Sequence, residues 1–162
     1  KKEIQLMANE GVRGYYQLTE AIKQELLQDK NINTVSTGDI TDINLYKQDI
    51  FPIGHIIVNN VQDQENVLVF NLSILACDVV NQSKDLTIDR FTGNDNLQDI
   101  LNTQLAVLNR LIQRLRKGTL YTDMYQLDGV PSLQPFYDRF DNQLAGWTAD
   151  ITVMIYNDIY IC

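Results

Sequence analysis

The order of hydrophobic patterns along the chain predicts an α+β fold, a mostly antiparallel sheet with two main helices packed on one face. Two segments place apolar residues every three or four positions, which is typical of amphipathic helices. Several shorter segments alternate apolar and polar side chains or are rich in β-branched residues, which is typical of strands. These segments follow the order helix, short strand, hairpin, helix, hairpin, and this order favours a two-layer sandwich.

Both helices are predicted from their apolar stripes. The first is expected over residues 15–29, with the stripe Tyr15, Leu18, Ile22 and Leu26. The second is expected over residues 95–117, with Asn94 or Asp95 as its N-cap and Gly118 as its stop. Its stripe comprises Leu97, Ile100, Leu101, Leu105, Leu108, Leu111, Ile112 and Leu115.

The strands are predicted at residues 34–40, in a hairpin of 53–61 with 66–80, and in a second hairpin of 133–144 with 147–161. One face of 66–80 carries Leu68, Phe70, Leu72, Ile74 and Ala76, and the other carries the mixed set Val67, Val69, Asn71, Ser73, Leu75 and Cys77. The final strand alternates more regularly. One side of the sheet is therefore expected to be core and the other to be half-covered.

Length and composition predict a single domain. The chain has 162 residues, of which 44% are hydrophobic, enough to fill one core. The domain is expected to span residues 14–162, preceded by an N-terminal arm of residues 1–13. Two long loops, 81–93 and 119–131, are expected to connect the elements.

The charge balance excludes several classes of protein. The chain has 13 Lys+Arg against 21 Asp+Glu, a net charge of −8. We therefore do not expect its main binding surface to be a basic nucleic-acid groove or a polybasic membrane patch. No apolar run has the length of a membrane span. Two cysteines and one histidine fit neither a disulfide framework nor a structural zinc site, so we expect a soluble protein made in a reducing cytoplasm. Asparagine and glutamine are unusually frequent, with 15 and 14 residues.

No catalytic, metal-binding or cofactor-binding pattern is evident, so we expect a protein that is not an enzyme. His55 alternates with apolar residues on a strand, and no nucleophile or carboxylate partner accompanies it, which favours a structural histidine. Cys77 is expected to pack in its strand, and Cys162 lies in no thiol signature. The aspartates near residues 85–99 match no calcium loop or two-metal spacing.

The polar faces of the strands are the feature that favours self-assembly. Large hydrogen-bonding side chains there suit a contact with a neighbouring subunit, although an ordinary solvated face would look the same. Basic residues at the end of the second helix favour salt bridges at an interface over phosphate binding. The candidate interface residues are Asn71, Ser73, Asp150, Thr152, Tyr156, Asp158, Tyr160, Arg110 and Arg114.

Five segments of the chain form a characteristic series. They are Thr37-Gly38-Asp39-Ile40 through Asn44-Leu45-Tyr46-Lys47-Gln48, Ile50-Phe51-Pro52-Ile53-Gly54-His55-Ile56-Ile57-Val58, Asp99-Ile100-Leu101-Asn102-Thr103-Gln104-Leu105, Tyr125-Gln126-Leu127-Asp128-Gly129, and Leu144-Ala145-Gly146-Trp147 with the ending Asn157-Asp158-Ile159-Tyr160-Ile161-Cys162. In the order and phrases of these segments, over roughly residues 14–162, the chain resembles tail-terminator and tail-completion proteins from the neck of tailed bacteriophages.

The resemblance implies a structural virion protein that is assembled in the host cytoplasm and carries no cofactor. Such proteins form a homo-oligomeric ring, expected here to be sixfold, at the junction of tail and neck. The ring caps the tail tube, in contractile tails holds the last sheath layer, and joins the tail to the neck and head connector. DNA passes through its bore without specific binding, which suits an acidic, amide-rich protein.

Three alternatives stay open at the level of sequence. A twelvefold adaptor ring under the portal would have a similar fold. A small ligand-binding α+β regulatory module would hold a metabolite in a cleft of its sheet. A hydrolase would use the dispersed aspartates.

Overall fold

The computed structural model describes residues 13–39, 50–81, 85–86, 88–91, 93, 95–118, 125–139 and 143–156. Its elements, in chain order, are α2 (Arg13–Leu27), β1 (Thr34–Thr37), β2 (Ile53–Asp63), β3 (Val67–Val79), α3 (Leu97–Lys117), β4 (Gln126–Arg139) and β5 (Leu144–Tyr156). The predicted order of helices and strands is confirmed. The expected arm lies outside the described residues, apart from Arg13, which is the first residue of α2.

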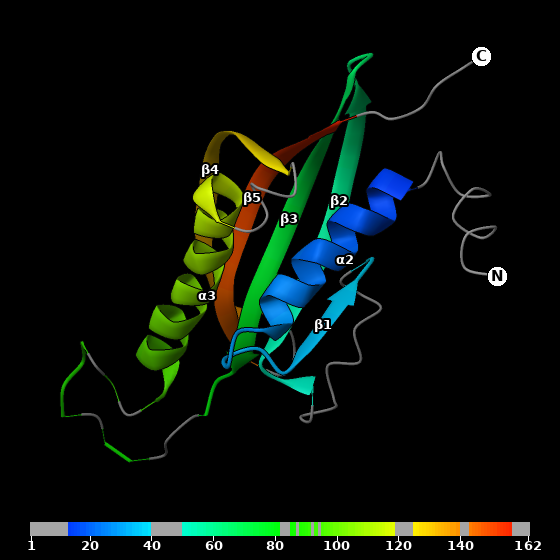
Figure 1. Ribbon diagram of the computed structural model, residues 1–162. Helices are drawn as coiled ribbons and strands as arrows, with labels where there is room; N and C mark the ends of the chain where they lie inside the picture. The colour runs from blue at the N-terminus through cyan, green and yellow to red at the C-terminus, as the bar shows by residue number, and fades with distance from the viewer. Residues whose placement is uncertain are drawn as a thin grey trace.

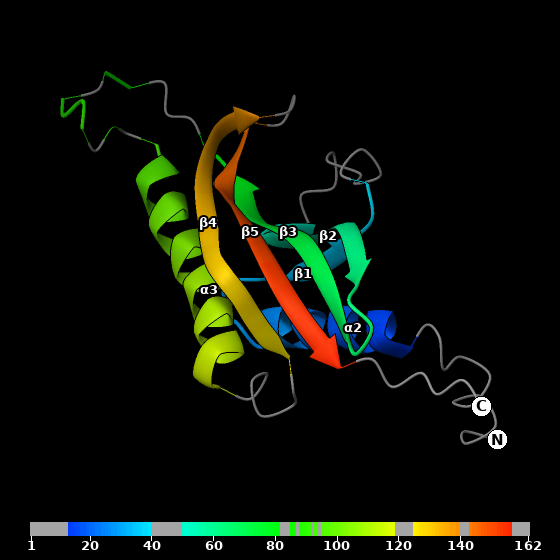
Figure 2. The ribbon, with the colours of Figure 1, turned by 90° about the horizontal axis from the view of Figure 1, so that it is seen from above.

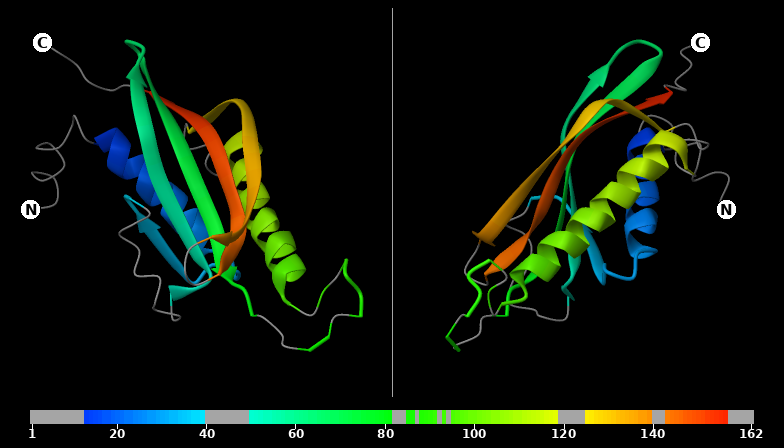
Figure 3. Two further views of the ribbon diagram at one scale, coloured as in Figure 1. Left: turned by 180° about the vertical axis from the view of Figure 1, so that it is seen from behind. Right: turned by 90° about the vertical axis from the view of Figure 1, so that its left-hand side faces the viewer.

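The strands form one mostly antiparallel sheet, as expected for the α+β class. The described strands lie in the order β1-β2-β3-β5-β4, and the short β1 is the one strand that pairs in parallel with its neighbour. Both helices lie in front of this sheet in Figure 1, and the two further views of Figure 3 show them on the same side. The view from above shows the twist of the strands (Figure 2).

One main core joins the two layers. Buried side chains from α2 and α3 pack against one face of the sheet, which we call the inner face. Its central members are Leu18, Ile22 and Leu26 of α2, Leu108, Leu111 and Leu115 of α3, Phe70, Leu72, Ile74 and Ala76 of β3, and Ala149, Ile151, Val153 and Ile155 of β5. The expected alternation of β3 and β5 is therefore confirmed. Tyr15, expected in the stripe of the first helix, is instead 38% exposed.

The ends of α3 differ from expectation. The N-cap position is Asn96, not Asp95, and its side-chain oxygen accepts the N–H of Asn81 at 2.7 Å, outside the helix. Asn94 lies outside the described residues. The helix does stop at Gly118, but in an extended conformation rather than the left-handed one that is common at this position.

The buried stripe of α3 is also rotated from the leucine pattern. Gln104 and Val107 are buried, whereas Leu101 and Leu105 are half-buried. The Trp147 indole N–H donates to the Leu101 carbonyl at 2.8 Å, so this side of α3 meets β5 through a polar contact as well. The leucine repeat alone could not reveal this.

β4 begins earlier than predicted, because residues 126–131 are strand and not loop. Gly129 and Pro131 are typical of loops, yet both are tolerated here because β4 is an edge strand whose pairing with β5 shifts between Asp128 and Ser132. β4 ends at Arg139, and Leu144, expected to end this strand, is the first residue of β5.

Candidate functional site

The face of the sheet turned away from both helices, here called the outer face, carries five of the predicted interface residues, four of them side by side on β3 and β5. Seen from behind, the strands lie in front of both helices, so neither described helix covers this face (Figure 3, left). Alternation along β3 and β5 places Asn71, Ser73, Asp150 and Thr152 there, with Ser73 opposite Asp150 and Asn71 opposite Thr152. The alternation expected within each strand is confirmed for these four residues, and the pairing of β3 with β5 brings them onto one face.

These four residues form a hydrogen-bonded group with Asn59 and Asn60 of β2, which we call the polar cluster. The Asn59 amide donates to the Ser73 hydroxyl at 2.8 Å, and this hydroxyl donates to Asp150 Oδ1 at 2.6 Å. The Thr152 hydroxyl donates to Asn71 Oδ1 at 2.9 Å, and the Asn71 amide donates to Asn60 Oδ1 at 2.5 Å. The polar cluster therefore ties three strands together through side chains.

A β-bulge explains how two consecutive residues of β2 join the polar cluster. The register between β2 and β3 shifts between Val58 and Asn60, so Asn59 is the extra residue. Without the bulge, Asn59 and Asn60 would point to opposite faces. Nothing in the strand-like run of β2 marks the bulge in advance.

One end of the outer face is apolar and covered. Ile53, Leu75, Cys77, Phe136 and Leu144 form a second buried group, separate from the main core. The expectation that this side of the sheet is half-covered is therefore confirmed. Burial and, to a lesser extent, the neighbouring Asp78 carboxylate together raise the pKa of the Cys77 thiol to about 12, so this cysteine is a packed strand residue as expected.

The other end of the outer face is exposed. Tyr156, the last residue of β5, follows Thr152 on the same face and is 58% exposed. Its partner in the register is Val67, at the start of β3. Asp158, Tyr160 and Cys162 lie outside the described residues.

The two arginines predicted for the interface lie in the other layer, where they bind α2 and the turn after it. Arg110 directs Nε and Nη2 to Asp29 Oδ2, at 2.7 and 2.6 Å. Arg114 pairs with Glu25 and also donates to the Glu25 carbonyl. The structure thus separates these arginines from the polar cluster and gives them an intramolecular role.

His55 is a structural histidine, as its sequence context favours. Its ring is 1% exposed on β2. Nε2 lies 3.0 Å from the Gly38 carbonyl, which can only accept, so Nε2 carries a proton, and Nδ1 is hydrogen-bonded to the Ser36 hydroxyl at 2.7 Å. The histidine joins the edge strand β1 to the sheet.

The segment between β3 and α3 exposes three large apolar side chains that sequence reasoning missed. Leu86, Ile88 and Phe91 are 94%, 100% and 84% exposed. The described parts of this segment project beyond the body of the molecule (Figures 1 and 2). Asp89 stabilises the turn, since its side chain accepts the Phe91 N–H and its carbonyl accepts the Gly93 N–H, both at 2.8 Å. The sequence does contain a signal for this exposed surface, because large apolar residues stand within an otherwise polar, loop-like segment.

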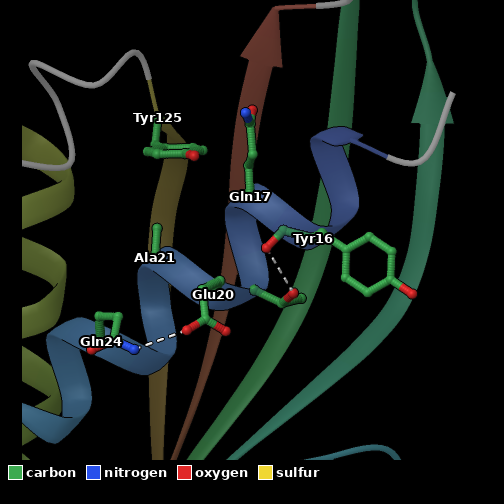
Figure 4. Close-up of a pocket in the computed structure, with 7 residues that line it drawn as sticks. Tyr16, Gln17, Glu20, Ala21, Gln24 and Tyr125 are labelled. Carbon is green, nitrogen blue, oxygen red and sulfur yellow. Dashed lines mark hydrogen bonds between the residues drawn. The ribbon is translucent and has the colours of Figure 1, made fainter. Parts of the chain in front are cut away.

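An open depression lies along α2, and its volume is about 610 Å³. Figure 4 shows the residues that line it. It is lined by Tyr16, Gln17, Thr19, Glu20, Ala21, Gln24 and Tyr125. Within it the Gln24 amide donates to Glu20 Oε1 at 2.8 Å, and Glu20 also lies 3.8 Å from the Lys23 ammonium. The depression runs along α2 and reaches Tyr125 just before β4, whereas the ligand-binding alternative expected a cleft in the sheet.

Within the described part of the chain, no group of three or more His, Cys, Asp or Glu side chains is placed to hold a metal ion. Neither described helix is long and apolar enough to cross a membrane. No model of a known protein family matches the chain, and no curated protein matches its sequence.

Proposed function

We propose that this chain is a structural virion protein of a tailed bacteriophage, which forms a homo-oligomeric ring at the junction of tail and neck. The ring is sixfold, caps the tail tube and joins it to the head connector, and DNA passes through its bore. Its other partners are the neck proteins and, in a contractile tail, the sheath. The protein acts by assembly and catalyses no reaction.

The observation that carries the proposal is the polar cluster on the outer face of the sheet. A hydrogen-bonded group of Asn, Ser, Thr and Asp that no described helix covers suits a contact with another protein surface. This supports the role implied by the resemblance of segment order to tail-terminator proteins. The net charge of −8 also supports it, because a bore without excess cations leaves DNA mobile.

The projecting residues Leu86, Ile88 and Phe91 support a second, different contact. Apolar side chains exposed to this degree cost solubility unless a partner covers them. Three of them bury too little area for a stable interface alone, since about 800 Å² per partner is typical. They would therefore act as an anchor on the tail tube or the neck, within a larger contact.

Assembly of the purified protein tests the proposal. Sedimentation velocity should show a discrete oligomer, and negative-stain images should show annuli with a central hole, whose subunit count separates six from twelve. The variant Tyr156→Ala with Tyr160→Ala should weaken assembly and leave the circular dichroism of the monomer unchanged. Tyr137→Ala is the matched control, because Tyr137 is similarly exposed but lies near the opposite end of the hairpin.

A protein that stays monomeric across protein concentrations and salt, without annuli, would contradict the proposal. Normal assembly of the double tyrosine variant would contradict the placement of the interface at the end of β5, while leaving the ring itself standing.

A further inference from the structure

Among the described residues, acidic and basic side chains are divided unequally between the sheet and the helices. β2, β3 and β5 contain no lysine or arginine, and in β4 Arg139 is the last residue. The C-terminal half of α3, in contrast, carries Arg110, Arg114, Arg116 and Lys117. The sheet is therefore acidic and this end of α3 is basic.

Two of the four cations on α3 have partners within the subunit and two do not. Arg110 and Arg114 pair with Asp29 and Glu25, as described above. Arg116 and Lys117 are exposed, and neither pairs with a carboxylate among the described residues. The helix dipole favours a cation at this end, but it leaves both side chains free to bind another surface.

The outer face of the sheet has the opposite excess. Asp128 of β4 lies opposite Thr152 of β5, and Asp150 stands two residues before Thr152 on the same face of β5. The two carboxylates therefore lie on neighbouring strands. Both are exposed, and no described lysine or arginine side chain pairs with them. Like charges at nearby positions of a strand pair disfavour the fold, and a cation supplied from outside would offset this.

We propose, resting on the ring proposed above, that Arg116 and Lys117 of one copy dock against Asp128 and Asp150 of the next. Because both halves of the complementary pair lie on one chain, each copy in a closed ring offers its cations to one neighbour and its carboxylates to the other. The two surfaces belong to opposite layers (Figure 3). The contact is therefore head-to-tail, the heterologous kind that closes into a ring when the rotation between copies allows it. The polar cluster beside Asp150 then supplies hydrogen-bonding groups around the ion pairs.

Charge reversal tests this contact directly. The variant Arg116→Glu with Lys117→Glu and the variant Asp128→Lys with Asp150→Lys each place like charges together in the proposed contact. Each should weaken association at least about tenfold, or about 1.4 kcal/mol. The variant with all four substitutions restores complementarity with the signs exchanged, and should associate within about threefold of the wild type.

Two controls separate the contact from fold and net charge. Lys23→Glu with Lys30→Glu changes the net charge as much as the α3 reversal does, and it should leave association unchanged. The fourfold variant carries the same unfavourable charges at the end of α3 as the double variant. Its recovery therefore cannot arise from helix stability. Wild-type association should also weaken between about 0.1 and 1 M salt, as the screening length falls from about 10 to 3 Å.

Sedimentation velocity on the five proteins gives three outcomes. Loss in both reversals with recovery in the fourfold variant supports the contact. The proposed contact is wrong if the wild type forms a ring and the variant with all four substitutions fails to recover association. It is also wrong if the two charge reversals associate as well as the Lys23 and Lys30 control. Either result leaves the proposed ring standing. A wild type that is monomeric throughout overturns both proposals.

Discussion

The inner and outer faces of the sheet are built from alternate residues of the same strands, yet different interactions stabilise them. On β3, Leu72 is buried in the main core, while Asn71 and Ser73 on either side of it belong to the polar cluster. The inner face packs against both helices through apolar contacts. The middle of the outer face is organised by hydrogen bonds between exposed or half-buried groups, each of modest net worth in water. The comparison indicates that the inner face supplies most of the stability, whereas the polar cluster in the middle of the outer face contributes little to it.

The largest expected effect comes from the inner side. Leu108→Ala removes a fully buried side chain of α3 from the main core. The lost burial and the cavity left behind should lower the free energy of unfolding by about 2–5 kcal/mol. Urea unfolding followed by circular dichroism measures this change.

The matched variant on the outer face is Asn71→Ala, which removes two hydrogen bonds of the polar cluster. Its groups stay accessible to water, so the cost should be about 0.5–1.5 kcal/mol. If Asn71→Ala destabilises the monomer as much as Leu108→Ala, the polar cluster is primarily structural and the comparison fails.

The inner face was easier to predict from the sequence than the outer face. Apolar periodicity identifies α3 and the buried sides of β3 and β5 because burial repeats at a fixed local spacing. Gln104 was missed for the same reason, since a buried amide interrupts an otherwise apolar stripe. Local patterns therefore located most of the core.

The outer face depends on contacts that no local pattern contains. Asp150 lies 77 residues from Ser73 in the chain, and their hydrogen bond exists because β5 pairs with β3 and not with its sequence neighbour alone. The bulge at Asn59 and the early start of β4 are features of pairing as well. Alternation placed Asn71, Ser73, Asp150 and Thr152 on polar faces, but their bonding required the strand order.

A second prediction concerns the close approach of β3 and β5 at the apolar end of the outer face. Gly146 lies opposite Cys77, and a Cβ at this position would stand 2.0 Å from the Ala76 carbonyl oxygen. Gly146→Ala should therefore force the strands apart and lower the free energy of unfolding by about 1–3 kcal/mol. Thermal unfolding of the two proteins measures the loss.

Gly129→Ala serves as the control for Gly146→Ala. Nothing lies within 4 Å of a Cβ at Gly129, but the residue has a positive φ of 68°. Its cost should come from backbone conformation alone, about 1 kcal/mol. A Gly146→Ala protein as stable as the wild type would show that the strands can separate here without loss, and that this end of the outer face is not tightly packed.

The smallest expected effect concerns a carboxylate on the inner side of β3. Asp78 continues the inner alternation and pairs with the buried Ala145. Burial raises the pKa of Asp78 above its ordinary value of 3.8, although the Val79 N–H, donating to Oδ1 at 2.8 Å, opposes the rise. A raised pKa in the folded state means that the protonated carboxyl favours folding below pH 3.8, and that this contribution is lost as the pH rises through the folded value.

Asp78→Asn keeps an oxygen acceptor for the Val79 N–H and removes the charge. Relative to the wild type, this variant should therefore gain stability as the pH rises from 3 to 7, by no more than about 0.5 kcal/mol because Asp78 is only half-buried. Urea unfolding of both proteins at each pH measures the difference, in which the titration of the other carboxylates cancels. Asp63→Asn is the control, since the Asp63 carboxylate also accepts a backbone N–H but is exposed. The stability difference between Asp78→Asn and the wild type could instead stay constant or reverse with pH. In that case the hydrogen bond from the Val79 N–H stabilises the Asp78 carboxylate more than burial destabilises it, and the inner face tolerates this charge without cost.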